Sequence, residues 1–433
     1  MSETKVFLIA VFVLLFCSYT RSQSLTNSPY SRYGIGEIIE KSVAQSQAMG
    51  GLDQAQRYSS WINYNNPASY SALELTTFQT GIKVSQTEQS TADVKQKLRN
   101  GYMTSLALGI PLKRNWGMSF GLVPYSSVGY KLSSTSVAAN GEEVSYLYNG
   151  TGGLNRVYLG TAILPFLNKS DSSWLKGFSI GVNVSYLFGN LNYERRAIFT
   201  NSSSNYYFNY RETEVFNMRD FYLDYGLQYK TKLNKKWLLV TGVSLTPTAK
   251  IGGKHSGLGE TYIVSNGFEY PKDTVSNYDN KSGHLTLPTR LGFGAIAHYS
   301  DKVAVGIDYK TQDWTNYSSF GVKDSLQKSN SISLGVQYIP NPANGRGFWQ
   351  HVQYRAGVNY SSTYLKIRNT QLTEQSIHLG AGFPIIKSLS TLNIALQYGT
   401  RGTIENNLVL EKFYALHVGL TFCDKWFIKR KFD

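Results

Sequence analysis

The sequence has few cysteines, few charged residues and no long hydrophobic run. Only Cys17 and Cys423 occur among 433 residues, and charged residues make up 16% of the chain. A membrane-spanning helix needs about 20 consecutive, mostly apolar residues. The one apolar helical stretch covers only residues 6–17, and the mean hydropathy is −0.27. These absences exclude a helical membrane protein and a small domain held together by disulfides.

The stretch 6–17 is typical of the core of a secretory signal peptide. It follows Lys5 and precedes small or polar residues, which predicts a signal peptide over residues 1–22. A lipoprotein signal at Cys17 is disfavoured because Phe16 stands where lipidation signals need a small residue. After cleavage only Cys423 would remain, so no intramolecular disulfide is expected.

Large apolar residues alternate with small or polar ones along most of the remaining chain. The segment from Phe413 to Phe422 carries Tyr414, Leu416, Val418, Leu420 and Phe422 on one face and Phe413, Ala415, His417, Gly419 and Thr421 on the other. Side chains of a strand alternate between the two faces of a sheet. An apolar face opposite a glycine-rich, mildly polar face is typical of the wall of a transmembrane β-barrel.

The composition and the turn signals agree with this interpretation. The chain has 32 Tyr, 21 Phe and 39 Gly, which suits a barrel with aromatic girdles. The spacing predicts an all-β, antiparallel barrel of about 14 strands over residues 73–423. Longer polar stretches at 131–153, 201–217, 251–287 and 312–330 are predicted to be extracellular loops. The 251–287 loop, with His255 and His284, is the longest of them.

The two ends of the mature chain lack this alternation. Residues 23–72 carry glycines and prolines but no strand pattern, which predicts an irregular segment that packs inside the barrel as a plug, or hatch. Residues 424–433 form a basic tail or the end of the last strand. The net charge of +15 is spread over loops and strand ends, so either a basic rim for lipopolysaccharide or simple loop solubility accounts for it. Nucleic acid is excluded by export.

One short motif resembles a known family. Ala48, Met49, Gly50, Gly51 and Ala55, followed by Asn66, Pro67 and Ala68, resemble the N-terminal hatch of FadL-like outer-membrane transporters of long-chain fatty acids and hydrocarbons. The stretches 28–36 and 425–431 resemble a Bacteroidetes branch of outer-membrane proteins. Between the two halves of the hatch motif, residues 56–61 depart from the acidic pair and small-residue run that such hatches usually have.

The resemblance implies a 14-stranded barrel closed by its N-terminal segment, passive diffusion of an apolar ligand, and an exit through the wall. It implies hatch or ligand roles for Gly50, Gly51, Asn66, Pro67 and Ala68. The alternative is that these residues only shape a turn before the first strand, since glycine, proline and asparagine favour turns.

Five basic residues are candidates for binding a carboxylate head group in the lumen. By strand parity the inward-facing basic residues are Arg290, His298, Arg355, His378 and His417. The alternative is that they are ordinary lumen residues hydrogen-bonded to their neighbours. No pair of histidines has the spacing of a helical zinc motif, and no cofactor fingerprint occurs, so no metal or cofactor is expected.

Two segments match the Gly-x-Ser-x-Gly motif of serine hydrolases. They are residues 117–121 and 177–181. The motif requires a strand, a sharp turn and a helix, whereas both segments lie inside predicted strands. The chain is therefore not expected to be an enzyme, and an outer-membrane lipid hydrolase is the weakest alternative.

The sequence thus predicts a monomeric barrel in the outer membrane of a Gram-negative bacterium. The predicted function is passive uptake of hydrophobic small molecules such as long-chain fatty acids, with outer-membrane lipids and lipopolysaccharide as the surrounding partners. The alternative is a structural or assembly component of the outer membrane that acts through its loops or tail. A continuous apolar channel would favour transport, and a lumen filled by polar side chains would favour the alternative.

Overall fold

A computed structural model gives the fold of most of the chain. It describes residues 25–39, 43–137, 142–166, 174–199, 207–342, 347–385 and 388–425. The predicted signal peptide (1–22, with Cys17) and nearly all of the predicted tail (424–433) lie outside these ranges. Within the described ranges, no helix is both long and apolar enough to cross a membrane.

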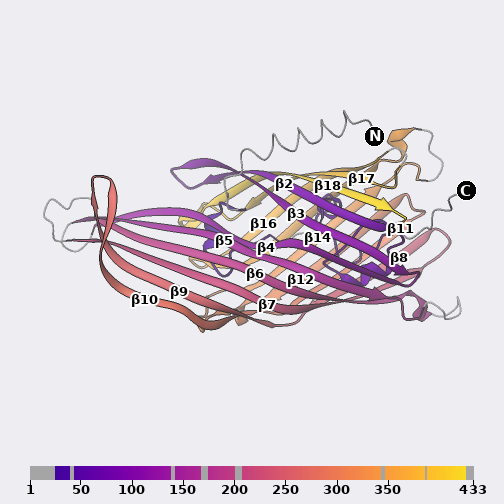
Figure 1. The fold of residues 1–433 in the computed structure, drawn as a ribbon. Coiled ribbons are helices and arrows are strands. Elements are labelled where there is room, and N and C mark those ends of the chain that lie inside the picture. The colour runs from indigo at the N-terminus through magenta and orange to yellow at the C-terminus, as the bar shows by residue number, and fades with distance from the viewer. Residues whose placement is uncertain are drawn as a thin grey trace, which may run out of the picture.

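The strands form one antiparallel sheet that closes on itself (Figure 1). Closure is made by the last strand pairing with the first of the wall, from Leu410↔Ser90 to Asp424↔Thr76. Ten of the strands cross the wall without interruption: β2 (Thr76–Ser90), β3 (Lys95–Lys113), β4 (Trp116–Val137), β5 (Glu143–Ile163), β6 (Phe178–Phe199), β7 (Asn209–Lys232), β12 (Val303–Asp313), β14 (Lys328–Tyr338), β15 (Gln353–Ile367) and β16 (Thr370–Pro384). Two more strands also cross the wall without interruption, namely β17 (Thr391–Arg401) and β18 (Leu410–Asp424).

Two further wall strands are each broken by a proline. Strand β8 (Trp237–Thr246) continues as β9 (Ala249–Ser265) beyond Pro247, and β10 (Phe268–Leu287) continues as β11 (Arg290–Tyr299) beyond Pro288. Proline has no N–H to give to a sheet, so each break falls where the pairing changes. Counting each broken pair once gives the predicted 14 wall strands. The short strands β1 (Glu37–Ile38) and β13 (Ser318–Ser319) lie outside this count.

Helices are few and short within the described ranges. They are η1 (Pro29–Arg32), α2 (Ala44–Gln47), η2 (Pro67–Ala72), η3 (Trp174–Gly177), η4 (Trp314–Asn316), η5 (Phe348–Gln350) and η6 (Glu405–Asn407). The all-β fold class is therefore confirmed.

The predicted alternation places side chains as expected. On β18, Tyr414 is 57% exposed, whereas its neighbours Phe413 and Ala415 are buried. The same outward apolar face runs round the wall, with exposed Ile180, Val184, Leu223, Val305, Ile307, Leu334, Ile377, Leu379 and Leu396. Exposed tryptophans gather at the end with short turns, namely Trp116, Trp174, Trp237 and Trp349. An apolar belt with an aromatic girdle predicts contact with lipid, with the short turns on the periplasmic side.

The opposite, outer end differs from the prediction. The predicted loop 251–287 is a hairpin of β9 and β10, and the predicted loop 131–153 is mostly the paired ends of β4 and β5. Together the outer parts of β5, β6, β7, β9 and β10 form a sheet, here called the tower, which projects beyond the barrel (Figure 1). The prediction of loops was wrong for these two stretches because a strand in water needs no apolar face, so backbone pairing continues where the alternation stops. The predicted loop 312–330 does join β12 to β14, with only η4 and the two-residue β13 in it.

The N-terminal segment packs against the inner surface of the wall. Helix η2 contacts β4, β5, β6 and β7, and α2 contacts β16, β17 and β18. Buried apolar residues of this segment include Ile35, Met49, Leu52, Ile62 and Tyr70. We call residues 25–39 and 43–75 the plug segment.

His255 of the tower offers a test of the packing there. Its ring stacks on Phe216, with ring centroids 4.0 Å apart, and its Nε2 lies 3.3 Å from Glu214 Oε1. Burial lowers the pKa of His255 by more than Glu214 raises it. The folded tower therefore favours the neutral ring, and this contribution to stability is present above pH about 6.5 and lost as the pH falls below it.

We expect Phe216→Ala to raise the pKa of His255 towards its ordinary value of about 6.5, because the ring becomes solvated. Histidine-selective NMR titration of the protein in detergent measures this. Phe268→Ala, which changes a phenylalanine that is 68% exposed in the same tower, is the matched control. A pKa that stays in place in the Phe216 variant would contradict burial as the cause.

Candidate functional site

The wall is interrupted between β3 and β4. The two strands pair from Lys113↔Trp116 only as far as Leu106↔Leu122. Beyond this point β3 continues to Lys95, paired only with β2, and β4 continues to Val137, paired with β5. Residues 123–130 of β4 are buried on both faces, so this part of the strand has turned away from the lipid. We call the opening the wall gap.

A short strand of the plug segment lies in the wall gap. Strand β1 pairs with β4 at Glu37↔Ser127 and Ile38↔Ser126, and the Ile39 N–H donates to the Tyr125 carbonyl at 3.0 Å. Gly36 precedes it with φ +88°, and a Cβ there would clash with the Ser127 carbonyl oxygen. Only glycine permits this approach. Strand β1 therefore satisfies backbone groups of β4 that β3 leaves without a partner strand.

A groove opens on the outer side of the wall gap. It has a volume of about 1070 Å³ and lies between the β2–β3 hairpin and the outer parts of β4, β5 and β6. Apolar and polar side chains share its lining. The apolar ones are Pro29, Val94, Leu98, Tyr130, Leu132, Leu147, Tyr193 and Val409, and the charged ones are Lys131 and Glu194.

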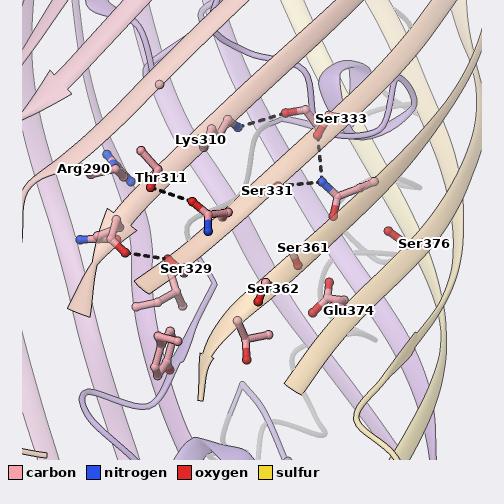
Figure 2. Close-up of a pocket in the computed structure, with 18 of the residues that line it drawn as sticks. Arg290, Lys310, Thr311, Ser329, Ser331, Ser333, Ser361, Ser362, Glu374 and Ser376 are labelled. Atoms are coloured by element: carbon pink, nitrogen blue, oxygen red, sulfur yellow. Dashed lines mark hydrogen bonds between the residues drawn. The ribbon is translucent and has the colours of Figure 1, made fainter. Parts of the chain in front are cut away.

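A second cavity, of about 290 Å³, lies in the lumen between the plug segment and strands β11 to β17. Its wall side is dominated by hydroxyl groups. Figure 2 shows Ser329, Ser331 and Ser333 of β14, Ser361 and Ser362 of β15, and Ser376 of β16 around it, together with Arg290, Lys310 and Glu374. One end is more apolar, with Trp314, Tyr364, Leu365 and Leu372. Most residues that line this cavity are thus polar, although apolar atoms make up more of its surface.

Buried charges join the plug segment to the wall. Lys310 Nζ lies 2.6 Å from Asp53 Oδ2, and Asp308 Oδ2 accepts the backbone N–H groups of Asp53 (2.6 Å) and Gln54 (3.0 Å). Burial would raise the pKa of Asp53, but the charge and hydrogen bond of Lys310 outweigh burial and hold this pKa below its usual value. Asp53 is therefore ionised and ties the plug segment to β12.

A second cluster centres on Arg401 of β17. Its guanidinium lies 2.7 Å from Glu37 Oε1 of the plug segment, 3.0 Å from Glu374 Oε2 and 3.7 Å from Glu411 Oε2. Thr26 Oγ1 also donates to Glu37 Oε2 at 2.6 Å. Glu37 thereby ties β1 to β17.

The five predicted hatch residues all belong to the plug segment but do not share one site. Gly50 and Gly51 line the lumen cavity. Asn66 caps η2, its Oδ1 accepting the Ala68 N–H at 3.2 Å, while its Nδ2 donates to the Gln54 carbonyl at 2.7 Å. Pro67 and Ala68 lie against Gly181 and Gly226 of β6 and β7. The alternative interpretation was that these residues only shape a turn. In the structure, the same turn also positions the plug segment on the wall.

The five predicted head-group residues are not gathered into one site. Arg290 and His378 line the lumen cavity, whereas His298 faces Tyr58 at the short-turn end with ring centroids 5.9 Å apart. Arg355 is hydrogen-bonded to Gln337 and Asn393, each at 2.8 Å. His417 bonds to Gln397 at 3.1 Å. The burial and neutral partners of Arg355 and His417 agree with the alternative interpretation of ordinary lumen residues, whereas Arg290 lies 3.7 Å from the carboxylate of Asp224. A carboxylate-binding role stays a prediction for all five residues.

The two serines in hydrolase-like motifs lie inside strands, as predicted. Ser119 is in β4, with its Oγ 3.1 Å from Tyr158 Oη, and Ser179 is in β6, with its Oγ donating to the Ala68 carbonyl at 2.6 Å. Neither is followed by a helix, so the elbow that would expose a nucleophile is not formed.

Sequence reasoning missed the buried charges. Besides the Asp53 and Arg401 clusters, Arg156 of β5 is fully buried, with Nη1 3.2 Å from Asp224 Oδ2 of β7. The available signal was parity, because Arg156, Asp224 and Asp308 all stand at inward positions of alternating strands.

The comparisons with known proteins agree with this geometry. A protein-family model described as BamG matches residues 4–433. The chain belongs to the BamG family. No curated protein matches this BamG-family chain in sequence.

Solved structures match the chain in fold. They include the CymD monoaromatic hydrocarbon channel (TM-score 0.55, 15% identity, 90% of this chain and 99% of that one). The Pseudomonas putida toluene transporter TodX has a TM-score of 0.55 at 16% identity, over 91% and 100% of the two chains. A Pseudomonas aeruginosa FadL homologue has a TM-score of 0.54 at 9% identity, over 89% and 99%. The resemblance to FadL-like proteins therefore holds for the fold, while the Bacteroidetes branch stays a prediction.

The glycine pair of the plug segment offers a matched test. Both residues have a positive φ, +73° at Gly50 and +82° at Gly51. A Cβ on Gly50 would stand 2.7 Å from the Val358 carbonyl oxygen and 2.9 Å from that of Leu334, whereas the nearest atom to one on Gly51 is 3.8 Å away. Both substitutions to alanine carry the same backbone strain, of about 1–2 kcal/mol.

We expect Gly50→Ala to lower the free energy of unfolding by about 1–3 kcal/mol more than Gly51→Ala does, because only the first forces the plug segment off β14 and β15. Urea unfolding of the BamG-family protein in detergent, followed by its heat-modifiable gel mobility, measures the difference. Equal losses in the two variants would show that the contact with the wall contributes nothing.

Proposed function

We propose that this BamG-family protein is an outer-membrane barrel that passes hydrophobic small molecules, including long-chain fatty acids, through the wall gap. The observation that carries the proposal is the end of β3–β4 pairing at Leu106↔Leu122 with a groove of about 1070 Å³ outside it. The proposed setting is a monomer in the outer membrane of a Gram-negative bacterium, surrounded by its lipids and by lipopolysaccharide.

The physical argument is that an apolar solute gains nothing from a water-filled pore. Each Å² of apolar surface removed from water is worth roughly 25 cal/mol, so a solute is held where apolar side chains replace water. Pro29, Leu98, Leu132 and Leu147 supply such contacts in the groove. The fold shared with the CymD channel and the TodX transporter supports this proposal, since those proteins carry monoaromatic hydrocarbons and toluene by their descriptions.

The test is uptake of labelled toluene and of a labelled long-chain fatty acid by cells that carry the protein or lack it. Thr151→Trp fills the groove from β5, because Thr151 lines it. Leu159→Trp is the matched control, since Leu159 is an exposed, lipid-facing residue of the same strand. We expect the Thr151 variant to lower protein-dependent uptake about tenfold, as loss of roughly 1.4 kcal/mol of apolar contact would, and the Leu159 variant to leave uptake unchanged.

Protein-dependent uptake of toluene but not of the fatty acid would restrict the substrate class to small hydrocarbons. Uptake that is the same with and without the protein would exclude transport of both. A labelled small sugar, measured in the same cells, checks that the barrel is not simply leaking.

The plug segment that fills the lumen favours a second candidate function, a structural or assembly component of the outer membrane. Ion pairs hold the plug segment to β12 and β17, and most residues that line the lumen cavity carry hydroxyl, amide or charged groups. In that case the tower, rather than a passage, would be the working surface. The predicted partner-binding tail lies at 424–433 and is almost entirely outside the described residues.

The same variants separate the two candidates. In cells that lack the protein, a structural role predicts a changed outer-membrane protein profile that wild type and Thr151→Trp restore equally. A transport role predicts that the profile does not depend on the protein while hydrocarbon uptake does.

A further inference from the structure

Three cavities lie in sequence from the outer groove to the lumen. Between the groove and the lumen cavity lies a small pocket of about 40 Å³, bounded by the plug segment, β2, β3 and β18. The groove and the small pocket share Asn27 and Gln89 in their linings. The small pocket and the lumen cavity share Glu37 and Arg401. Neighbouring cavities that share lining residues lie against the same residues.

The Glu37–Arg401 ion pair therefore lies at the boundary between the small pocket and the lumen cavity. Its members are 2.7 Å apart, and their side chains are 18% and 13% exposed. Glu37 is also one of the two residues of β1, the strand that lies in the wall gap. Movement of this one side chain would both remove one of the contacts that hold β1 in the wall gap and widen the boundary between the small pocket and the lumen cavity.

The contacts of β1 are few enough to break together. Besides its pairing with β4, the strand is held by the Glu37 ion pair, by Thr26 Oγ1, which donates to Glu37 Oε2 at 2.6 Å, and by Tyr364 Oη, which donates to the Gly36 carbonyl at 2.6 Å. Arg401 keeps Glu374 and Glu411 as partners when Glu37 leaves. The guanidinium is thus not left uncompensated, which lowers the cost of opening relative to an isolated buried pair.

We propose that Glu37 and Arg401 form an inner gate: their ion pair holds β1 in the wall gap and closes the path from the groove to the lumen cavity. The gate extends the proposed function by naming the residues that control passage. A charged constriction also sets specificity. An apolar solute cannot replace the hydrogen bonds of this pair, so it crosses only when β1 moves as a unit.

The gate is tested by leakage, which requires no knowledge of the transported ligand. Purified protein is placed in phospholipid vesicles, and swelling in arabinose is recorded. We expect wild type to swell no faster than protein-free vesicles. Glu37→Gln keeps the size of the side chain but removes its charge, and we expect at least a tenfold rise in protein-dependent swelling, because losing a charge-assisted hydrogen bond shifts the population towards the open state.

A second variant reaches the same state by a different route. Gly36→Ala places a Cβ against the Ser127 carbonyl and displaces β1 without changing any charge, so it should also raise swelling. Glu88→Gln is the matched control, since Glu88 of β2 pairs with Lys97 at 3.6 Å on the surface and lines none of the three cavities. Heat-modifiable gel mobility shows whether each variant is a folded barrel.

A reversible lock completes the experiment. Ile38 and Ser126 are Cα partners, and paired antiparallel strands bring Cα atoms to about 4.5–5.5 Å, within the range of a disulfide. Ile38→Cys and Ser126→Cys are combined with Cys423→Ser and Glu37→Gln. Swelling that is suppressed when oxidised and returns on reduction supports the gate.

Folded Glu37→Gln and Gly36→Ala proteins that both swell like wild type would overturn the gate, as would swelling that the closed disulfide does not reduce. Either result leaves hydrocarbon uptake, and hence the proposed function, to be judged by its own assay.

Discussion

Backbone hydrogen bonding in lipid is the constraint on which the rest of this structure depends. Inside a bilayer no water can satisfy an N–H or C=O group, so a sheet must close on itself. The β18–β2 pairing meets this requirement over its full length. The wall gap is the one stretch among the described strands where neighbouring wall strands separate within the wall. There the inward turn of β4 and the insertion of β1 supply what β3 does not.

The same constraint explains why the strands alternate strictly inside the lipid belt but not beyond it. Within the lipid belt, the wall follows a strict alternation, because one face meets hydrocarbon and the other meets the plug segment. Beyond the belt, β9 and β10 keep pairing although most residues of β10 are exposed on both faces. Water satisfies the free edge there, and Pro271 together with three register shifts between β9 and β10 makes that edge a poor template for another strand.

The sequence could predict what depends on local periodicity. The 14 wall strands, the outward face of β18 and the strand positions of Ser119 and Ser179 all followed from parity and turn signals. The tower could not be predicted, because strands that are polar on both faces have no period that separates them from loops. The wall gap begins where the pairing of β3 with β4 ends, at Leu106↔Leu122. It depends on how two strands lie relative to each other, so the sequence of neither strand alone predicts it.

The candidate site was predictable only in part for a related reason. Parity correctly turned Arg290 and His378 inward, and both line the lumen cavity. It could not show that Arg355 would be satisfied by Gln337 and Asn393, or that Glu37, Glu374 and Glu411 would converge on Arg401 from three separate elements. Convergence of that kind depends on the curvature of the closed sheet.

The paired proline breaks at Pro247 and Pro288 have a consequence for how the molecule can change over evolution. Both fall at one level, where β8 pairs with β11 below and β9 pairs with β10 above. Thr248 and Thr289 bridge the junction, their hydroxyl oxygens 2.9 Å apart. The hairpin above this line is joined to β7 and, at two residue pairs of β10, to β13, but forms no ladder with β8 or with β12. The length and surface of this hairpin can therefore vary while the register of the wall strands in the lipid stays the same.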